Sequence, residues 1–108
     1  SASLPVFRAA GRFAINVLAS SQHDLCRRFA QRVDGDRFDG VELAASRTGL
    51  PILAGALATF ECETHAQYEA GDHVVLVGRV LHWGAGSGDA LILRAGRMLS
   101  SRSAVELH

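Results

Sequence analysis

The sequence contains no lysine, and all eleven of its basic residues are arginine. A lysine Schiff base and a Walker-type phosphate lysine are therefore excluded for these residues, because both need a lysine side chain. The formal net charge is zero, which argues against non-specific binding to nucleic acid, since that requires a basic surface. No apolar run approaches the roughly 18 residues of a membrane span, so we expect no membrane segment.

Cysteine is scarce as well. Cys26 and Cys62 are the only two, which is too few for a disulfide framework, so the default expectation is a cytoplasmic protein. No cysteine or histidine pair has the spacing of a metal motif such as C-x-x-C or H-E-x-x-H, and we therefore expect no metal site. Each cysteine falls on the apolar side of an expected element, where cysteine usually serves as a small hydrophobic residue.

What the sequence does contain is typical of a globular protein. It has 108 residues, of which 48% are hydrophobic and 20% are charged, so we expect residues 1–108 to form one domain or part of one. The first residue is Ser1 rather than methionine, and we expect a segment upstream of it.

The first third of the chain predicts a helix, a strand and a second helix. Ser3 can cap a short helix over residues 4–7, since the first helical turn tolerates the proline there. Residues 13–18 are apolar with one exception and predict a strand. Ser21, followed three residues later by Asp24, resembles a capping box, and the apolar spacing after it predicts an amphipathic helix of about three turns over 25–33.

The rest of the chain is typical of a sheet. Residues 56–64 alternate in polarity, which predicts a strand with one buried face. We expect loops at 34–49 and 83–89. The other expected strands are 73–81, entered through a Gly71-Asp72 turn, and the short segments 91–93 and 97–99. About five strands joined by short turns indicate an antiparallel or barrel-like sheet, and so few strands leave an open edge that upstream strands would close.

Three polar features stand out against this apolar background. Asn16 lies inside an apolar strand, and a buried amide without a partner costs on the order of 1–3 kcal/mol, so its partner is either backbone or a ligand. Asp72 either orients His73 or only shapes the turn. Ser1 and Ser3 at a helix N-terminus would suit a phosphate group, and helix capping is the alternative.

Four segments, in this order and spacing, resemble the flavin reductase-like, FMN-binding split-barrel proteins, and the resemblance covers nearly the whole chain. The segments are 13–19 with Gln22 and Phe29-Ala30 after it, 51–58 followed by Glu61-Cys62, 71–80, and 91–97. The relatives nearest in type are the short-chain NAD(P)H:flavin oxidoreductases.

This resemblance implies a mainly β fold with flanking helices, namely an antiparallel split β-barrel of the FMN-binding type that here lacks its N-terminal strands. It implies a homodimer that binds FMN (or FAD) near the dimer interface. It also implies an NAD(P)H-dependent flavin reductase, in which a hydride passes from NADH or NADPH to the flavin and the reduced flavin supplies a monooxygenase component.

The resemblance also assigns site residues by position. His73 matches the histidine that faces the nicotinamide or the flavin ring, and it is the catalytic candidate. Six further positions match flavin-binding residues, at the phosphate, along the edge of the isoalloxazine ring and close to the flavin: Ser1 and Ser3, then Asn16, Leu18 and Ala19, then Phe29.

The chain departs from the family pattern in one important respect. Members of the family are longer, and their N-terminal part supplies the first barrel strands with a Thr/Ser-rich flavin-binding segment. The alternative function is therefore a non-catalytic flavin-binding or dimerising barrel fragment, and a third is an interaction module without a ligand. The choices between FMN and FAD and between NADH and NADPH, and the identity of the monooxygenase, stay open.

Overall fold

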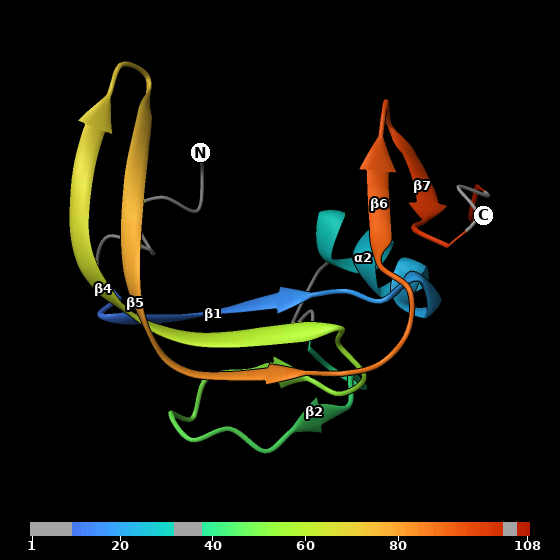
Figure 1. Cartoon of the computed structure of the whole chain (residues 1–108), viewed down its shortest axis with the longest axis horizontal. Helices are drawn as coiled ribbons and strands as arrows, with labels where there is room; N and C mark the ends of the chain where they lie inside the picture. The colour runs from blue at the N-terminus through green and yellow to red at the C-terminus, as the bar shows by residue number, and fades with distance from the viewer. Residues whose placement is uncertain (1–9, 32–37, 103–105) are drawn as a thin grey trace.

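The computed structural model describes residues 10–31, 38–102 and 106–108. Within these ranges the chain is mainly β, with one α-helix beside the strands (Figure 1). In chain order the elements are β1 (Arg12–Val17), the short 3-10 helix η1 (Ser20–Gln22), α2 (His23–Ala30), β2 (Leu43–Ala44), β3 (Ile52–Leu53), β4 (Ala58–Ala70), β5 (His73–Ala85), β6 (Leu91–Arg94) and β7 (Arg97–Ser100). The short helix expected over residues 4–7 lies outside the described residues.

The central sheet has three antiparallel strands in the order β1-β4-β5. Its register places Ile15 of β1 opposite Phe60 of β4, and Phe60 opposite Trp83 of β5. Two register shifts interrupt the pairing of β4 with β5, and such bulges bend a strand pair. Figure 1 shows the result, because the β4–β5 hairpin curves away from β1 and continues as a separate arm.

Two smaller sheets complete the described fold. β2 pairs with β3, and β6 pairs with β7, both in antiparallel fashion. An isolated bridge between Ala19 and Ala90 attaches the β6–β7 hairpin next to the end of β1. The expected antiparallel, mainly β architecture with a helix beside it is therefore confirmed, whereas the described strands form three separate sheets and do not close a barrel.

The amphipathic helix is shorter than its pattern predicts. α2 ends at Ala30, and Gln31 is already extended, which lets the chain return so that Phe38 packs on Phe29 with ring centroids 5.0 Å apart. The expected cap at Ser21 and Asp24 is wrong. Asp24 instead pairs with Arg27 at 2.9 Å, and the reciprocal capping contacts lie two residues earlier, between Ala19 and Gln22.

Two expected loops contain strand residues. β2 lies within residues 34–49, because Leu43 and Ala44 pair with β3. β5 extends through Ala85 into the expected loop 83–89, since β4 supplies pairing partners there despite the glycine. The most buried apolar residues gather around the junction of β1, β3 and the start of β4: Ala19, Ile52, Leu53, Ala56 and Cys62. Among the described residues, no helix has the length and apolar character that crossing a membrane requires.

Candidate functional site

The side chain of Asn16 joins β1 to the segment that contains β3. Its Nδ2 donates to the carbonyl oxygen of Pro51 at 3.2 Å, and its Oδ1 accepts the N–H of Leu53 at 2.9 Å. Both ends of the amide are therefore satisfied by backbone, which is one of the two alternatives that the sequence left open. The bond to Leu53 also explains why an amide is tolerated in an apolar strand, because a paired polar group escapes the cost of burial.

Asn16 lines a pocket together with two other residues that the resemblance assigned to flavin binding. Leu18, directly after β1, and Phe29, on α2, line it, and Phe38 and Leu53 complete the lining. The cavity volume is about 260 Å³, which lies near the lower limit for small-molecule sites. We name this the Asn16 pocket. Its lining is mostly apolar, as expected for a surface that contacts the edge of an aromatic ring.

Ala19 lies beside the Asn16 pocket but is itself only 4% exposed. Its N–H donates to Oε1 of Gln22 at 3.0 Å. The carbonyl oxygen of Leu18 accepts the N–H of Leu91 at 3.1 Å, and the N–H of Ser20 donates to the backbone carbonyl oxygen of Asp89 at 2.8 Å. The backbone of this junction is therefore tied into the protein, and the contact expected from Ala19 would need a group other than its N–H.

The remaining predicted site residues are not brought to this pocket. Ser1 and Ser3 lie outside the described residues. His73 starts β5 at the end of the β4–β5 arm, where its side chain is 83% exposed, and Figure 1 shows this end far from α2. Its Nε2 lies 3.5 Å from Oδ1 of Asp72, a contact between two exposed groups. The role of His73 therefore stays a prediction.

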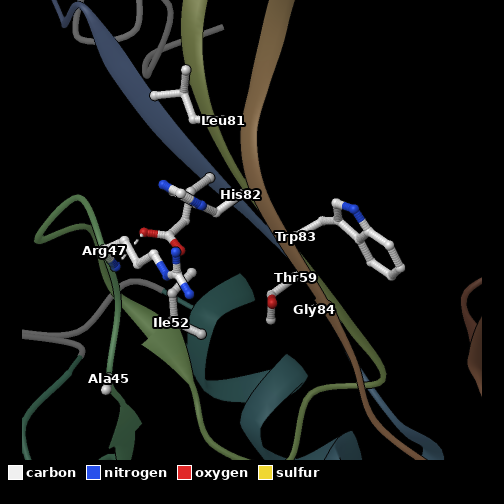
Figure 2. A pocket seen from close by; sticks show the side chains of 9 residues that line it. Ala45, Arg47, Ile52, Thr59, Leu81, His82, Trp83 and Gly84 are labelled. Atoms are coloured by element: carbon white, nitrogen blue, oxygen red, sulfur yellow. Dashed lines mark hydrogen bonds between the residues drawn. The ribbon is translucent and has the colours of Figure 1, made fainter.

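A second pocket lies on the same face of the central sheet as Asn16, where residues of β4 and β5 face the segment around β2 and β3 (Figure 2). Its volume is about 420 Å³, and its lining includes Arg47, Glu61 and His82. Glu61 is only 8% exposed, although the alternating pattern placed it on the polar face of the strand. Sequence reasoning missed this residue, and the only signal was its place in the Glu61-Cys62 motif. Figure 2 shows Trp83 turned away from Arg47 and His82.

Glu61 anchors the turn that follows β2. Its Oε1 accepts the hydroxyl of Thr48 at 2.5 Å and the N–H groups of Thr48 and Arg47 at 3.0 and 3.1 Å. The Thr48 hydroxyl bond lowers the pKa of Glu61 most, and burial opposes it, while the two backbone bonds and the nearby His82 lower the pKa further. The bonds to Oε1 therefore give Glu61 a structural role in holding the turn.

The two cysteines behave as the sequence predicts. Cys62 is 3% exposed on β4, and burial raises the pKa of its thiol. Cys26 lies half-buried on α2, and both thiols are free. A buried thiol with a raised pKa is a poor nucleophile. Among the described residues, no group of three or more His, Cys, Asp or Glu side chains could hold a metal ion.

One face of the central sheet carries an apolar surface that the described residues leave uncovered. The row across the three strands runs from Ile15, which is 46% exposed, through Phe60 to Trp83, which is 73% exposed. Beside this row lies a pocket of about 320 Å³. We name this surface the open apolar face; the pocket beside the row is lined by Phe13, Ile15, Phe60, Cys62, Leu76, Gly78 and Val80. A contiguous apolar surface of this kind usually marks an interface.

Comparison with known proteins gives a consistent result. The family model of the flavin reductase like domain matches residues 1–100. A flavin reductase from Pseudomonas putida is 39% identical over 93 residues, which cover 86% of this chain and 54% of that protein. The reductase subunit HsaB of a flavin-dependent monooxygenase from Rhodococcus jostii is 41% identical over 80 residues, which cover 74% of this chain and 40% of that protein.

A solved structure agrees with these relatives. An NADH:FAD oxidoreductase of Streptomyces globisporus C-1027, in complex with NAD and FAD fragments, superposes with a TM-score of 0.81 at 31% identity. The match covers 91% of this chain and 60% of that one. The chain therefore spans about half the length of the curated relatives that it matches.

Proposed function

Because this chain belongs to the family of flavin reductase-like domains, we propose that it binds the isoalloxazine edge of FMN or FAD in the Asn16 pocket. The observation that carries this proposal is that Asn16 and Leu18, from the β1 segment, and Phe29, from α2, line one cavity. These residues are the ones that the family resemblance assigns to flavin binding by position. Apolar and aromatic walls suit a flat ring system, since they bury its faces and edge.

The reaction that we propose is hydride transfer from NADH or NADPH to the flavin, which would then serve a monooxygenase. Support comes from the monooxygenase reductase subunit of Rhodococcus jostii and from the NADH:FAD oxidoreductase among the similar proteins. Hydride transfer is the cofactors' own chemistry, and the protein contributes binding and orientation. This division fits a chain whose described pockets contain no activated nucleophile, because the buried Cys62 thiol has a raised pKa.

A second candidate is a flavin-binding or dimerising unit without reductase activity of its own. Two observations favour it: the open apolar face of the central sheet, and the 83% exposure of His73 at the end of the arm. Additional strands or a second copy of the chain could cover the open apolar face and bury His73. A homodimer, and a pocket completed within it, therefore belong to the proposal.

Titration with FMN and with FAD tests these alternatives directly. We expect quenching of flavin fluorescence on binding, and loss of the flavin absorbance after NADH is added anaerobically. Binding without NADH-dependent bleaching would favour the second candidate, and a colourless dimer that quenches neither flavin would refute both.

Phe29→Ala locates the binding site. Removing one aromatic wall is expected to weaken flavin binding about three- to tenfold. Tyr68→Ala is the matched control, because Tyr68 is an exposed aromatic residue on the β4–β5 arm. Equal affinities for the two variants would show that the flavin binds elsewhere.

A further inference from the structure

Gln22 belongs to the motif that carries the family resemblance, but it is not among the residues that line the Asn16 pocket. Its half-buried side chain uses both ends of its amide. Oε1 accepts the N–H of Ala19 at 3.0 Å, and Nε2 donates to the carbonyl oxygen of Ala54 at 2.9 Å. Since one end of an amide accepts and the other donates, Gln22 ties together two segments that lie 32 residues or more apart in the chain.

The segments that Gln22 holds supply three walls of the Asn16 pocket. Its two backbone partners directly follow Leu18 and Leu53 in the chain, and both of these leucines line the pocket. Gln22 itself is the N-cap residue of α2, which carries Phe29. A single side chain therefore fixes the spacing of the β1, β3 and α2 walls.

The backbone at Gly55 lies close to the side-chain amide of Gln22. Gly55 has φ +80°, and a Cβ atom there would lie 3.3 Å from Nε2 of Gln22, which is tighter than ordinary van der Waals contact. A larger residue at position 55 would be strained and would also press on the amide. Asn16 bonds the same segment through Pro51 and Leu53, just before Ala54 in the chain. The side-chain amides of Asn16 and Gln22 therefore both hold this segment in place.

We propose that Gln22 is a positioning residue for flavin binding, which holds the Leu18, Leu53 and Phe29 walls at the separation that the ring requires. This inference rests on the proposed function, because it presumes that the Asn16 pocket holds the flavin. Gln22 need not touch the flavin, since both ends of its amide are engaged with backbone. Its effect on affinity would come from preorganisation, which removes the cost of assembling the site on binding.

Two substitutions separate the ends of the amide. Gln22→Glu keeps an acceptor for the Ala19 N–H but presents a second acceptor to Ala54, and Gln22→Met keeps the size of the side chain without either bond. We expect the Kd for FMN to rise about threefold for the Glu variant and about tenfold for the Met variant. Gln67→Glu and Gln67→Met are the matched controls, because Gln67 is exposed on the arm, and both should bind like the wild type.

The Kd must be measured at a temperature where circular dichroism shows every variant to be folded, so that a purely structural role would leave it unchanged. Hydrogen exchange of the Ala19 amide, measured by NMR without flavin, reports its bond to Gln22 independently and should accelerate in Gln22→Met but not in Gln22→Glu. Wild-type affinity in both Gln22 variants would overturn the inference and leave the proposed function standing. A wild-type chain that binds no flavin would overturn the proposed function and this inference with it.

Discussion

Replacing Gly86 by alanine would place a methyl carbon 2.6 Å from the carbonyl oxygen of Ala56. That oxygen belongs to the backbone, so it cannot move away by a side-chain rotation. The N–H of Gly86 also donates to the carbonyl oxygen of Leu57 at 2.8 Å, so moving the two segments apart would break a hydrogen bond. The close approach of these segments therefore makes glycine necessary at position 86.

Gly78 provides a comparison at nearly the same distance. A Cβ atom there would lie 2.5 Å from Cζ of Phe13 and 3.3 Å from Cβ of Cys62. The nearest obstacle is now the far end of a half-buried ring, which can rotate away. Gly11 is the control, because nothing lies within 4 Å of the Cβ that it would gain.

The magnitudes follow from two opposing effects. Overpacking costs about 1–3 kcal/mol, and alanine recovers about 0.4–1 kcal/mol by restricting the unfolded chain. We expect Gly86→Ala to lose about 2 kcal/mol and Gly78→Ala to lose less than about 1 kcal/mol. Gly11→Ala should be neutral or stabilising. For a domain of this size, about 1 kcal/mol shifts the Tm by roughly 4–8 °C, so Gly86→Ala should lower the Tm by about 8–16 °C.

Thermal unfolding followed by circular dichroism measures all three variants under the same conditions. A double-mutant cycle adds a specific check, because in a Phe13→Ala background, where only the Cys62 contact remains, the Gly78→Ala change should cost less than it does in the wild type. The reasoning would be refuted if Gly78→Ala were as destabilising as Gly86→Ala. A loss for Gly11→Ala equal to that for Gly86→Ala would refute it equally, since the clash would then not be the cause.

Three further results are expected. The pKa of Glu61 is lowered mainly by the Thr48 hydroxyl, so its stabilising effect is complete above the ordinary value of 4.5 and is lost as the pH falls through the lower folded value. The Tm should therefore drop on acidification, and Glu61→Gln should flatten this drop; an unchanged profile would contradict the assignment. Cys26 should react with Ellman's reagent in the native protein, whereas Cys62, whose pKa is raised by burial, should react only in denaturant, and equal native rates would show the burial to be wrong. His73→Ala should raise the apparent KM for NADH with little change in flavin Kd, and an unchanged NADH dependence would count against a nicotinamide contact.

Local patterns predicted part of the long hairpin. Residues 58–64 of the expected strand lie in β4, which continues to Ala70, and the Gly71-Asp72 turn joins β4 to β5 as expected. Both signals are local, because the side-chain period of a strand and the conformational preference of turn residues act over a few positions. Gly71 has φ +64°, which explains its place in the turn.

Features that depend on distant partners could not be predicted in the same way. The alternation assigned Glu61 to the polar face, but Glu61 is buried, and its Oε1 accepts the N–H of Thr48, thirteen residues earlier. Asn16 was recognisable as an amide that needed partners, but these lie 35 and 37 residues away. No local period encodes such a pairing, and the same is true of the two-residue strands β2 and β3, which exist only as each other's partners.

The residues proposed for flavin binding and for the nicotinamide contact lie in different parts of the fold. The Asn16 pocket is built from β1, α2 and β3, whereas His73 stands at the end of the β4–β5 arm on the other side of the molecule (Figure 1). Hydride transfer requires the nicotinamide to lie against the flavin ring within contact distance. If the pocket holds the ring, the described residues of one chain do not bring His73 to it. We therefore expect substitutions in the Asn16 pocket to change flavin affinity, and substitutions at His73 to change the NADH dependence, independently of each other.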